Sequence, residues 1–269
     1  MKSLIHSEWE RLLNKKIFTL VFLIIPVIVF AMANYYSNKN QFLSINDPQY
    51  VYVSNFPVLS LIEIFIPFFN MLVMFAVVFS FTEEYRTGQI RLVLLRKYRL
   101  VQVFIAKFLV ILLYLFLVLL SYYVFSLFIG YFYFEQADSL YVFNFEQPVS
   151  VAKSYVYGLK YYILAFVTLI CLVTIFIFLS AISYSTTIAV GINFSFLIFS
   201  LFISAMLSNT FGEGSLLKYV SIIAIQFTGI AQAISDTGML LGILSFLCSY
   251  IIISLLLSIF YFSKKDFFL

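Results

Sequence analysis

The chain has 269 residues, of which 64% are hydrophobic, 20% are aromatic and only 10% are charged, and its net charge is +4. A soluble domain of this length could not bury so much apolar surface, so the composition excludes a soluble globular protein. We therefore expect an all-α integral membrane protein, a single transmembrane domain over residues 1–269 in the plasma membrane. The basic residues suit membrane anchoring rather than nucleic-acid binding.

Residues 1–16 predict an amphipathic helix ahead of the first apolar run. Its apolar residues fall close to one helical face and its charged residues mostly elsewhere, which is typical of a helix lying at the cytoplasmic membrane surface. A docking surface for a partner protein would use the same residues, so this alternative stays open. The apolar set is Leu4, Ile5, Trp9, Leu12 and Leu13, and the charged set is Lys2, Glu8, Arg11 and Lys15.

Six apolar runs follow, each long enough to supply the roughly 20 residues that a helix needs to cross the ~30 Å hydrocarbon layer. The first run has no small-residue cleavage site, so we expect a retained helix rather than a signal peptide. The runs cover residues 17–35, 58–81, 101–131, 160–183, 186–208 and 239–262.

The basic residues predict the orientation, because Lys and Arg in short loops are retained in the cytoplasm. With the N-terminus inside, 12 of the 16 Lys and Arg residues are cytoplasmic. The other four, Lys39, Lys153, Lys160 and Lys218, lie outside. Both termini are then cytoplasmic.

The last outward segment, residues 209–238, contains an apolar patch from Tyr219 to Ile234 that is too short to cross the membrane comfortably. We expect a re-entrant or interfacial hairpin there, before the sixth membrane helix.

Catalytic chemistry is not expected in this chain. The serines have no accompanying base, and there is no GxxxxGK[ST] phosphate loop, so we expect neither catalytic residues nor a cofactor. Cys171, Cys248 and His6 lack metal-ligand spacing, and we expect no metal. From Tyr161 to Gly212 there is no Asp, Glu, Lys, Arg or His, which disfavours an ion-coupled transporter. Glu63, about two turns into the second run, has either a structural role or a substrate contact.

Residues 82–99, between the second and third runs, form a segment that is longer than a simple connection needs and that has a helical hydrophobic pattern. Ile90, Val93 and Leu94 have helical spacing, and basic residues surround them. An adjacent acidic pair, Glu83 and Glu84, opens the interval. The pattern predicts a cytoplasmic helix held between the membrane and a protein partner.

This interval resembles the cytoplasmic connection of type-2 ABC exporter permeases. The matching residues are Glu83 and Glu84 for the acidic pair, Gly88 for the glycine, Leu92 and Leu94 for the leucines, and Lys107 for the lysine in "IAKFL". The departures are Gln89 for threonine, Lys97 for proline, Arg99 one position early, and Ala106 for glycine. The form "EYRTGQIR" is similar to the Gram-positive subgroup that handles antimicrobial or toxin peptides.

The resemblance implies a permease subunit that has no ATPase site of its own. Two permease subunits, identical or paralogous, would pair with two ABC ATPase subunits that bind ATP and Mg²⁺. Residues 82–99 would be the coupling helix, and the N-terminal helix would also touch the ATPase. The coupling residues would be Glu83, Glu84, Arg86, Gly88 and Arg91.

The leading hypothesis is therefore ATP-driven export, or extraction from the membrane, of an amphipathic or hydrophobic substrate. We expect toxin or antimicrobial peptides as the first choice of substrate and drugs or lipids as the second. A sensor or immunity role is the third choice. From other classes, an ion-coupled secondary transporter and a non-transporting membrane scaffold remain alternatives. A neighbouring gene for an ATPase would distinguish them.

Overall fold

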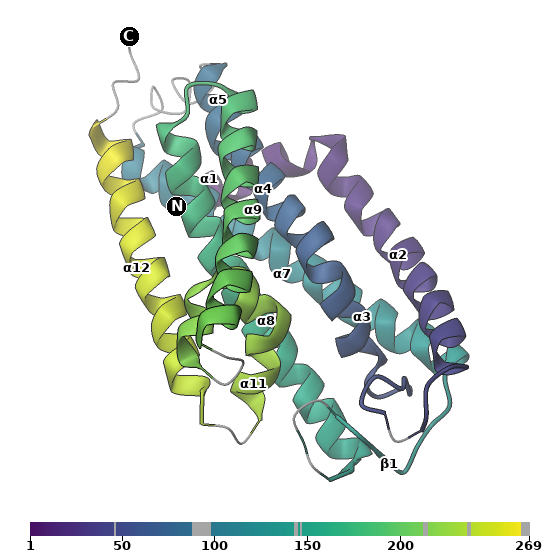
Figure 1. The fold of residues 1–269 in the computed structure, drawn as a ribbon. Coiled ribbons are helices and arrows are strands. Elements are labelled where there is room, and N and C mark those ends of the chain that lie inside the picture. The colour runs from purple at the N-terminus through teal and green to yellow at the C-terminus, as the bar shows by residue number, and fades with distance from the viewer. Residues whose placement is uncertain are drawn as a thin grey trace.

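The computed structural model describes residues 1–45, 47–87, 98–142, 145, 147–211, 215–235 and 238–264. This part of the chain is almost entirely helical (Figure 1). Its one sheet is a short antiparallel pair of strands, β1 (Ser139–Leu140) and β2 (Val149–Ser150).

Six helices in the described residues are long and apolar enough to cross a membrane, which confirms the expected class of all-α membrane protein. They are α2 (Lys16–Asn40), the composite helix Phe56–Thr82, α7 (Leu100–Tyr133), α8 (Val151–Ile182), α9 (Thr186–Phe211) and the span Leu240–Phe262 of α12 (Leu240–Lys264).

The clearest difference from the sequence prediction is the start of the fourth helix. The apolar run was expected to begin at residue 160, whereas α8 begins at Val151. Residues such as Lys153 lower the local hydropathy without ending the helix. A hydropathy window therefore finds the part of a helix that suits hydrocarbon, and α8 extends about two and a half turns before that part.

The second membrane helix is composite. It comprises α3 (Phe56–Ile64), the π-helical segment η1 (Phe65–Asn70), α4 (Met71–Val77), the π-helical segment η2 (Val78–Thr82) and α5 (Glu83–Arg86). π-Helical turns are rare, and they often occur at functional sites. Here they separate Glu63, near one end of the helix, from the acidic pair at the other end.

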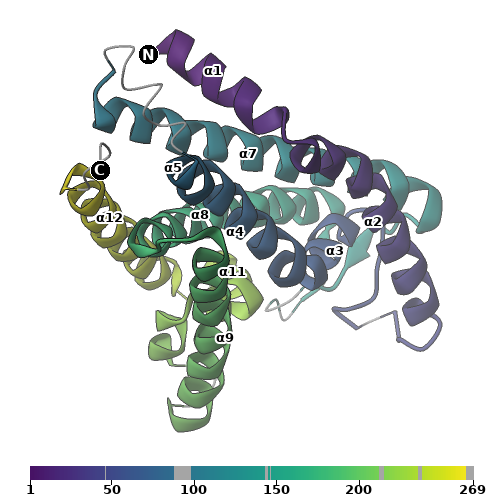
Figure 2. The same ribbon diagram turned by 90° about the horizontal axis from the view of Figure 1, so that it is seen from above.

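Helix α8 lies at the centre of the packing. Buried residues occur along most of its length, from Ser154 to Ala181. It contacts α12, α4, α7 and α11. In contrast, α9 and the α12 span bury only a small part of their surface, and Figure 2 shows α9 standing away from α2 and α7. In a membrane, such apolar surfaces can face lipid without cost.

The segment before α12 is helical but short. It comprises the 3-10 turn η3 (Leu216–Val220), α10 (Ile222–Ala224), the π-helical η4 (Ile225–Gly229) and α11 (Ile230–Ile234). A Cβ at Gly229 would lie 2.9 Å from Cδ1 of Tyr219, so glycine is what lets this segment fold closely against η3. The span Ile222–Ile234 is too short to cross a bilayer. Its position at the membrane stays a prediction.

The N-terminal residues form helix α1 (Lys2–Leu13), which lies alongside α7 (Figure 2). Leu4 of α1 forms a small buried cluster with Val103 and Ala106 of α7. Glu8, which the sequence placed mostly away from the apolar face, is buried. A position at the membrane surface stays a prediction for this helix.

The predicted coupling helix lies mostly outside the described residues. Its described parts are residues 82–87, which include α5, and residues 98–99. Gly88 and Arg91, two of the predicted coupling residues, lie outside them.

Candidate functional site

Four charged side chains meet where α1, α5 and α7 converge, and we call Glu8, Arg11, Glu84 and Lys107 the ionic cluster. The Lys107 Nζ atom lies 2.7 Å from Glu8 Oε2 and 2.5 Å from Glu84 Oε2. Arg11 Nη1 lies 3.1 Å from Glu8 Oε1 and 2.9 Å from Glu84 Oε2. Each acid therefore contacts both bases, and the four formal charges sum to zero.

The ionic cluster is largely inaccessible to solvent. The side chains of Lys107, Glu8 and Glu84 are only 1%, 3% and 4% exposed. Burying an unpaired charge costs several kcal/mol, so burial is tolerable here only because every charge has two opposite partners. The cluster thus fixes three segments that are far apart in sequence to one another.

A second ion pair extends this connection to the start of α2. Lys15 Nζ lies 2.7 Å from Glu83 Oε2 and donates a hydrogen bond of 2.6 Å to the carbonyl oxygen of Phe79. The same ammonium lies 5.5 Å from the centre of the Phe79 ring. Both acids of the adjacent pair are therefore engaged within the chain, Glu84 in the ionic cluster and Glu83 with Lys15.

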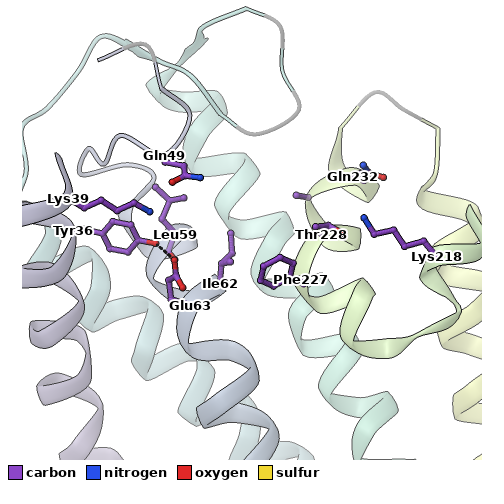
Figure 3. Close-up of a pocket in the computed structure, with 11 residues that line it drawn as sticks. Tyr36, Lys39, Gln49, Leu59, Ile62, Glu63, Lys218, Phe227, Thr228 and Gln232 are labelled. Carbon is purple, nitrogen blue, oxygen red and sulfur yellow. Dashed lines mark hydrogen bonds between the residues drawn. The ribbon is translucent and has the colours of Figure 1, made fainter. Parts of the chain in front are cut away.

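At the opposite end of the molecule lies a cavity of about 380 Å³, which we call the outer pocket because the topology expected from the sequence places it on the outer side. Figure 3 shows it between α2 and α3 on one side and the η3 to α11 segment on the other. Its volume falls within the range of small-ligand sites, roughly 300–1,000 Å³. It is lined by Tyr36, Lys39, Gln49, Leu59, Ile62, Glu63, Lys218, Phe227, Thr228, Ala231 and Gln232.

Glu63 is only weakly satisfied within the outer pocket. The Tyr36 hydroxyl lies 3.0 Å from the carbonyl oxygen of Leu59 and 3.4 Å from Glu63 Oε1, the contact dashed in Figure 3. One hydroxyl proton serves both acceptors, and the shorter contact is to Leu59. An ionised carboxylate has about four acceptor sites, so most of the capacity of Glu63 is unused by the described residues.

Two lysines share this pocket with Glu63, and within the described part of the chain none of the three forms an ion pair. Lys39 Nζ lies 5.4 Å from the centre of the Tyr36 ring. Lys218 Nζ lies 5.9 Å from the centre of the Tyr219 ring. The outer pocket therefore presents one acidic and two basic groups whose charges are not neutralised by short contacts with one another.

A buried amide pair connects the two π-helical segments η1 and η4. Asn70 Nδ2 donates to Gln226 Oε1 over 2.7 Å, and Gln226 Nε2 donates back to Asn70 Oδ1 over 3.0 Å. Both side chains are almost fully buried. This reciprocal pair fastens the segment that forms one wall of the outer pocket to the second membrane helix.

A family model described as "Protein of unknown function (DUF2705)" matches residues 19–268. The chain belongs to the DUF2705 family. None of the curated proteins matches the chain. The DUF2705 match includes Glu63, Glu84 and Lys107 but begins after α1, so Glu8 and Arg11 of the ionic cluster lie outside the matched residues.

The predicted site residues of this DUF2705 protein separate into two groups. Glu63 lines the outer pocket, whereas Glu83, Glu84 and Arg86 lie at the other end of the same composite helix. Glu84 faces inward, but Arg86 is exposed and forms no ion pair with the described residues.

Sequence reasoning did not select Glu8, Arg11 or Lys15 as site residues. The signal that could have found them is Lys107, a cation inside an apolar run that requires an acidic partner.

Proposed function

We propose that this DUF2705 protein is the permease subunit of an ATP-driven type-2 ABC exporter. It would export an amphipathic or hydrophobic substrate, or extract it from the membrane. Toxin or antimicrobial peptides are the first choice of substrate class, and drugs or lipids are the second. ATP and Mg²⁺ would be bound by two partner ATPase subunits, and a second permease chain, identical or paralogous, would complete the transporter. Both termini would be cytoplasmic in the plasma membrane.

The observation that supports this proposal is the ionic cluster. The acidic pair and the lysine of "IAKFL" carry the resemblance to these permeases, and Glu84 and Lys107 are direct partners in the structure. Two of the residues that carry the resemblance, Glu84 and Lys107, are therefore in direct contact although they are 23 residues apart in sequence. Such a contact gives these residue types a shared physical role, which a basic loop between two membrane helices would not require.

The cluster is suited to transmit movement. An ATPase that displaced the segment after α5 would move Glu84, and Glu84 holds Lys107 of α7 and Arg11 of α1. Because an uncompensated buried charge is costly, these contacts resist separation and the three segments would move together. Glu84 would thus act as an internal positioning residue, and the exposed Arg86 would face the ATPase.

The test is to co-express the chain with any ABC ATPase whose gene adjoins its own, to purify the two together, and to measure ATP hydrolysis with and without an amphipathic peptide. We expect Arg86→Glu to lower ATPase retention at least several-fold, because a reversed charge would oppose its partner at the interface. Lys16→Glu is the matched control, since Lys16 is an exposed base near the same end of the molecule.

Two results would contradict the proposal. One is the absence of any stable complex with an ATPase. The other is equal retention and equal stimulation in the Arg86→Glu and Lys16→Glu variants.

A competing class, the ion-coupled transporter, gains one observation from the structure. Glu8 and Glu84 are buried carboxylates, the kind of group that proton-coupled transporters use as relays. Both are fully paired with bases, however, which favours a structural role. Transport in inside-out vesicles separates the classes, because an exporter requires ATP and continues when a protonophore removes the proton gradient.

A further inference from the structure

The outer pocket has a chemical character that the proposed function does not specify. Glu63 offers unused acceptor sites, and Lys39 and Lys218 each offer an ammonium with no ion pair among the described residues. A purely anionic ligand would leave Glu63 unmatched and repelled. A purely cationic ligand would leave both lysines unmatched. A ligand carrying both an ammonium and an acidic group would match all three.

The polar, uncharged lining fits the same ligand. Gln49 lies on the side of Lys39 and Glu63, and Thr228 and Gln232 lie on the side of Lys218 (Figure 3). Their amide and hydroxyl groups can hydrogen-bond to ester and phosphate oxygens. Leu59, Ile62 and Phe227 add an apolar part to the wall. The pocket thus combines polar and apolar walls, as an amphiphile requires, with Leu59, Ile62 and Phe227 between the two charged sides (Figure 3).

The position of the pocket favours a lipid as the source of this chemistry. Lys39 is in the last turn of α2, and Glu63 lies seven residues beyond the first residue of α3, roughly 10 Å along the helix axis. If the helix ends lie at the membrane surface, as the sequence predicts, both groups are near the depth of lipid head groups. The Phe227 ring at the pocket is 62% exposed and can contact an acyl chain.

We propose that the outer pocket binds the head group of a zwitterionic phospholipid or lysophospholipid, with its primary ammonium at Glu63 and its phosphate at Lys39 and Lys218. If the proposed export function is correct, this amphiphile belongs to the substrate class that the protein extracts or moves. Binding itself does not depend on an ATPase, so the two proposals can fail separately.

The test uses the full chain purified without an ATPase in a maltoside detergent, which carries no charge. Native mass spectrometry counts bound oleoyl lysophosphatidylethanolamine across a titration. Two probes with the same chain length separate the charges: oleoyl lysophosphatidylglycerol has the phosphate without the ammonium, and oleylamine has an ammonium without the phosphate. We expect saturable binding of one zwitterionic lipid per chain, and weaker binding of both single-charge probes.

Variants assign the binding to the pocket. Glu63→Gln and Lys218→Met should each weaken binding of the zwitterionic lipid about tenfold, as expected for loss of one charge-assisted hydrogen bond. Asp138→Asn and Lys153→Met are matched controls, because these charged groups are exposed near the same end of the molecule and do not line the outer pocket. Both controls should bind as the wild type does. Size-exclusion chromatography confirms that each variant is folded.

Three results would overturn the proposal. The first is unchanged binding in both Glu63→Gln and Lys218→Met. The second is equal affinity for the zwitterionic lipid and for lysophosphatidylglycerol. The third concerns peptides: binding of trileucine with free termini that is lost in Glu63→Gln, together with no binding of the lysolipid, would assign the pocket to a peptide. Failure to stimulate an ATPase would bear on the export proposal alone.

Discussion

At the scale of single residues, the ionic cluster is notable for its charge balance. Removing Lys107 leaves two buried carboxylates with one base, and removing Glu84 leaves two bases with one acid. Removing both leaves Glu8 and Arg11 still paired over 3.1 Å. The cluster is therefore sensitive to the loss of one charge and more tolerant of the loss of an opposite pair.

The first prediction follows from this balance. Lys107→Met should lower the free energy of unfolding by about 3–5 kcal/mol, the usual cost of leaving a buried charge uncompensated. The double variant Glu84→Gln with Lys107→Met should lose clearly less than the sum of the two single variants. Thermal unfolding of the purified protein in detergent, followed by the fluorescence of Trp9 on α1, measures both effects.

Glu10→Gln is the control for this prediction, since the Glu10 carboxylate is 62% exposed and, among the described residues, pairs only with His6 over 3.3 Å. Exposed pairs contribute at most about 1 kcal/mol, so this variant should unfold almost as the wild type does. Strictly additive single and double variants would mean that Glu84 and Lys107 are not energetically coupled.

At the scale of elements, the Asn70–Gln226 pair decides how firmly the short α10 to α11 segment is held. Asn70→Leu should lower the free energy of unfolding by about 1–3 kcal/mol, because the buried Gln226 amide loses both of its short hydrogen bonds. Hydrogen exchange should then become faster in residues 222–234 than in α8. Mass spectrometry of exchanged peptides measures the difference.

Asn34→Leu provides the matched control for that experiment. Asn34 is exposed on α2, and within the described part of the chain its amide donates only to the Phe30 carbonyl oxygen of its own helix. The same substitution there should leave exchange in residues 222–234 unchanged. Equal exchange in the Asn70 and Asn34 variants would show that the amide pair does not hold the segment.

The membrane helices could be predicted from the sequence because hydropathy depends only on local composition. The limits of α8 could not, since Lys153 and Ser154 lower the local hydropathy yet continue a helix. The π-helical segments were also beyond prediction. Two of them, η1 and η4, are joined by the contact between Asn70 and Gln226, which are 156 residues apart in sequence and which no local pattern brings together.

The candidate sites were predictable only in part, because the sequence shows local features but not contacts between distant segments. Glu63 is conspicuous as a charge within an apolar run, whereas Glu84 and Lys107 were singled out because they match the motif of type-2 ABC permeases. Their partners were not selected, because Arg11 belongs to an amphipathic helix where a basic residue is ordinary. To predict a buried ion pair, one must know which distant helices meet, and the local sequence pattern does not give that information.

At the scale of the whole molecule, the two candidate sites lie at opposite ends of one composite helix. Glu63 of α3 lines the outer pocket, and Glu84 of α5 belongs to the ionic cluster. The π-helical segments η1 and η2 lie between them, and η1 also holds the pocket wall through Asn70. A shift of this helix at one end would therefore alter the pocket at the other, which is the arrangement an ATP-driven permease needs.

This arrangement has meaning only if the two ends face opposite sides of the membrane, and the orientation can be tested directly. Of the Lys and Arg residues, 12 of 16 fall on the side of the ionic cluster by the expected topology, which predicts that this side is cytoplasmic. We therefore expect a cysteine at Ser139 to react with an impermeant thiol reagent in intact cells. A cysteine at Asn14, between α1 and α2, should react only after the cells are opened.

Both positions are exposed, so burial would not prevent labelling at either one. The experiment uses a background in which Cys171 and Cys248 are replaced by alanine, since these are the two native cysteines. Labelling of Asn14→Cys in intact cells would place the ionic cluster outside, beyond the reach of any cytoplasmic ATPase. The same result would turn the outer pocket towards the cytoplasm, so the export proposal and the expected position of the pocket on the outer side would both have to be abandoned.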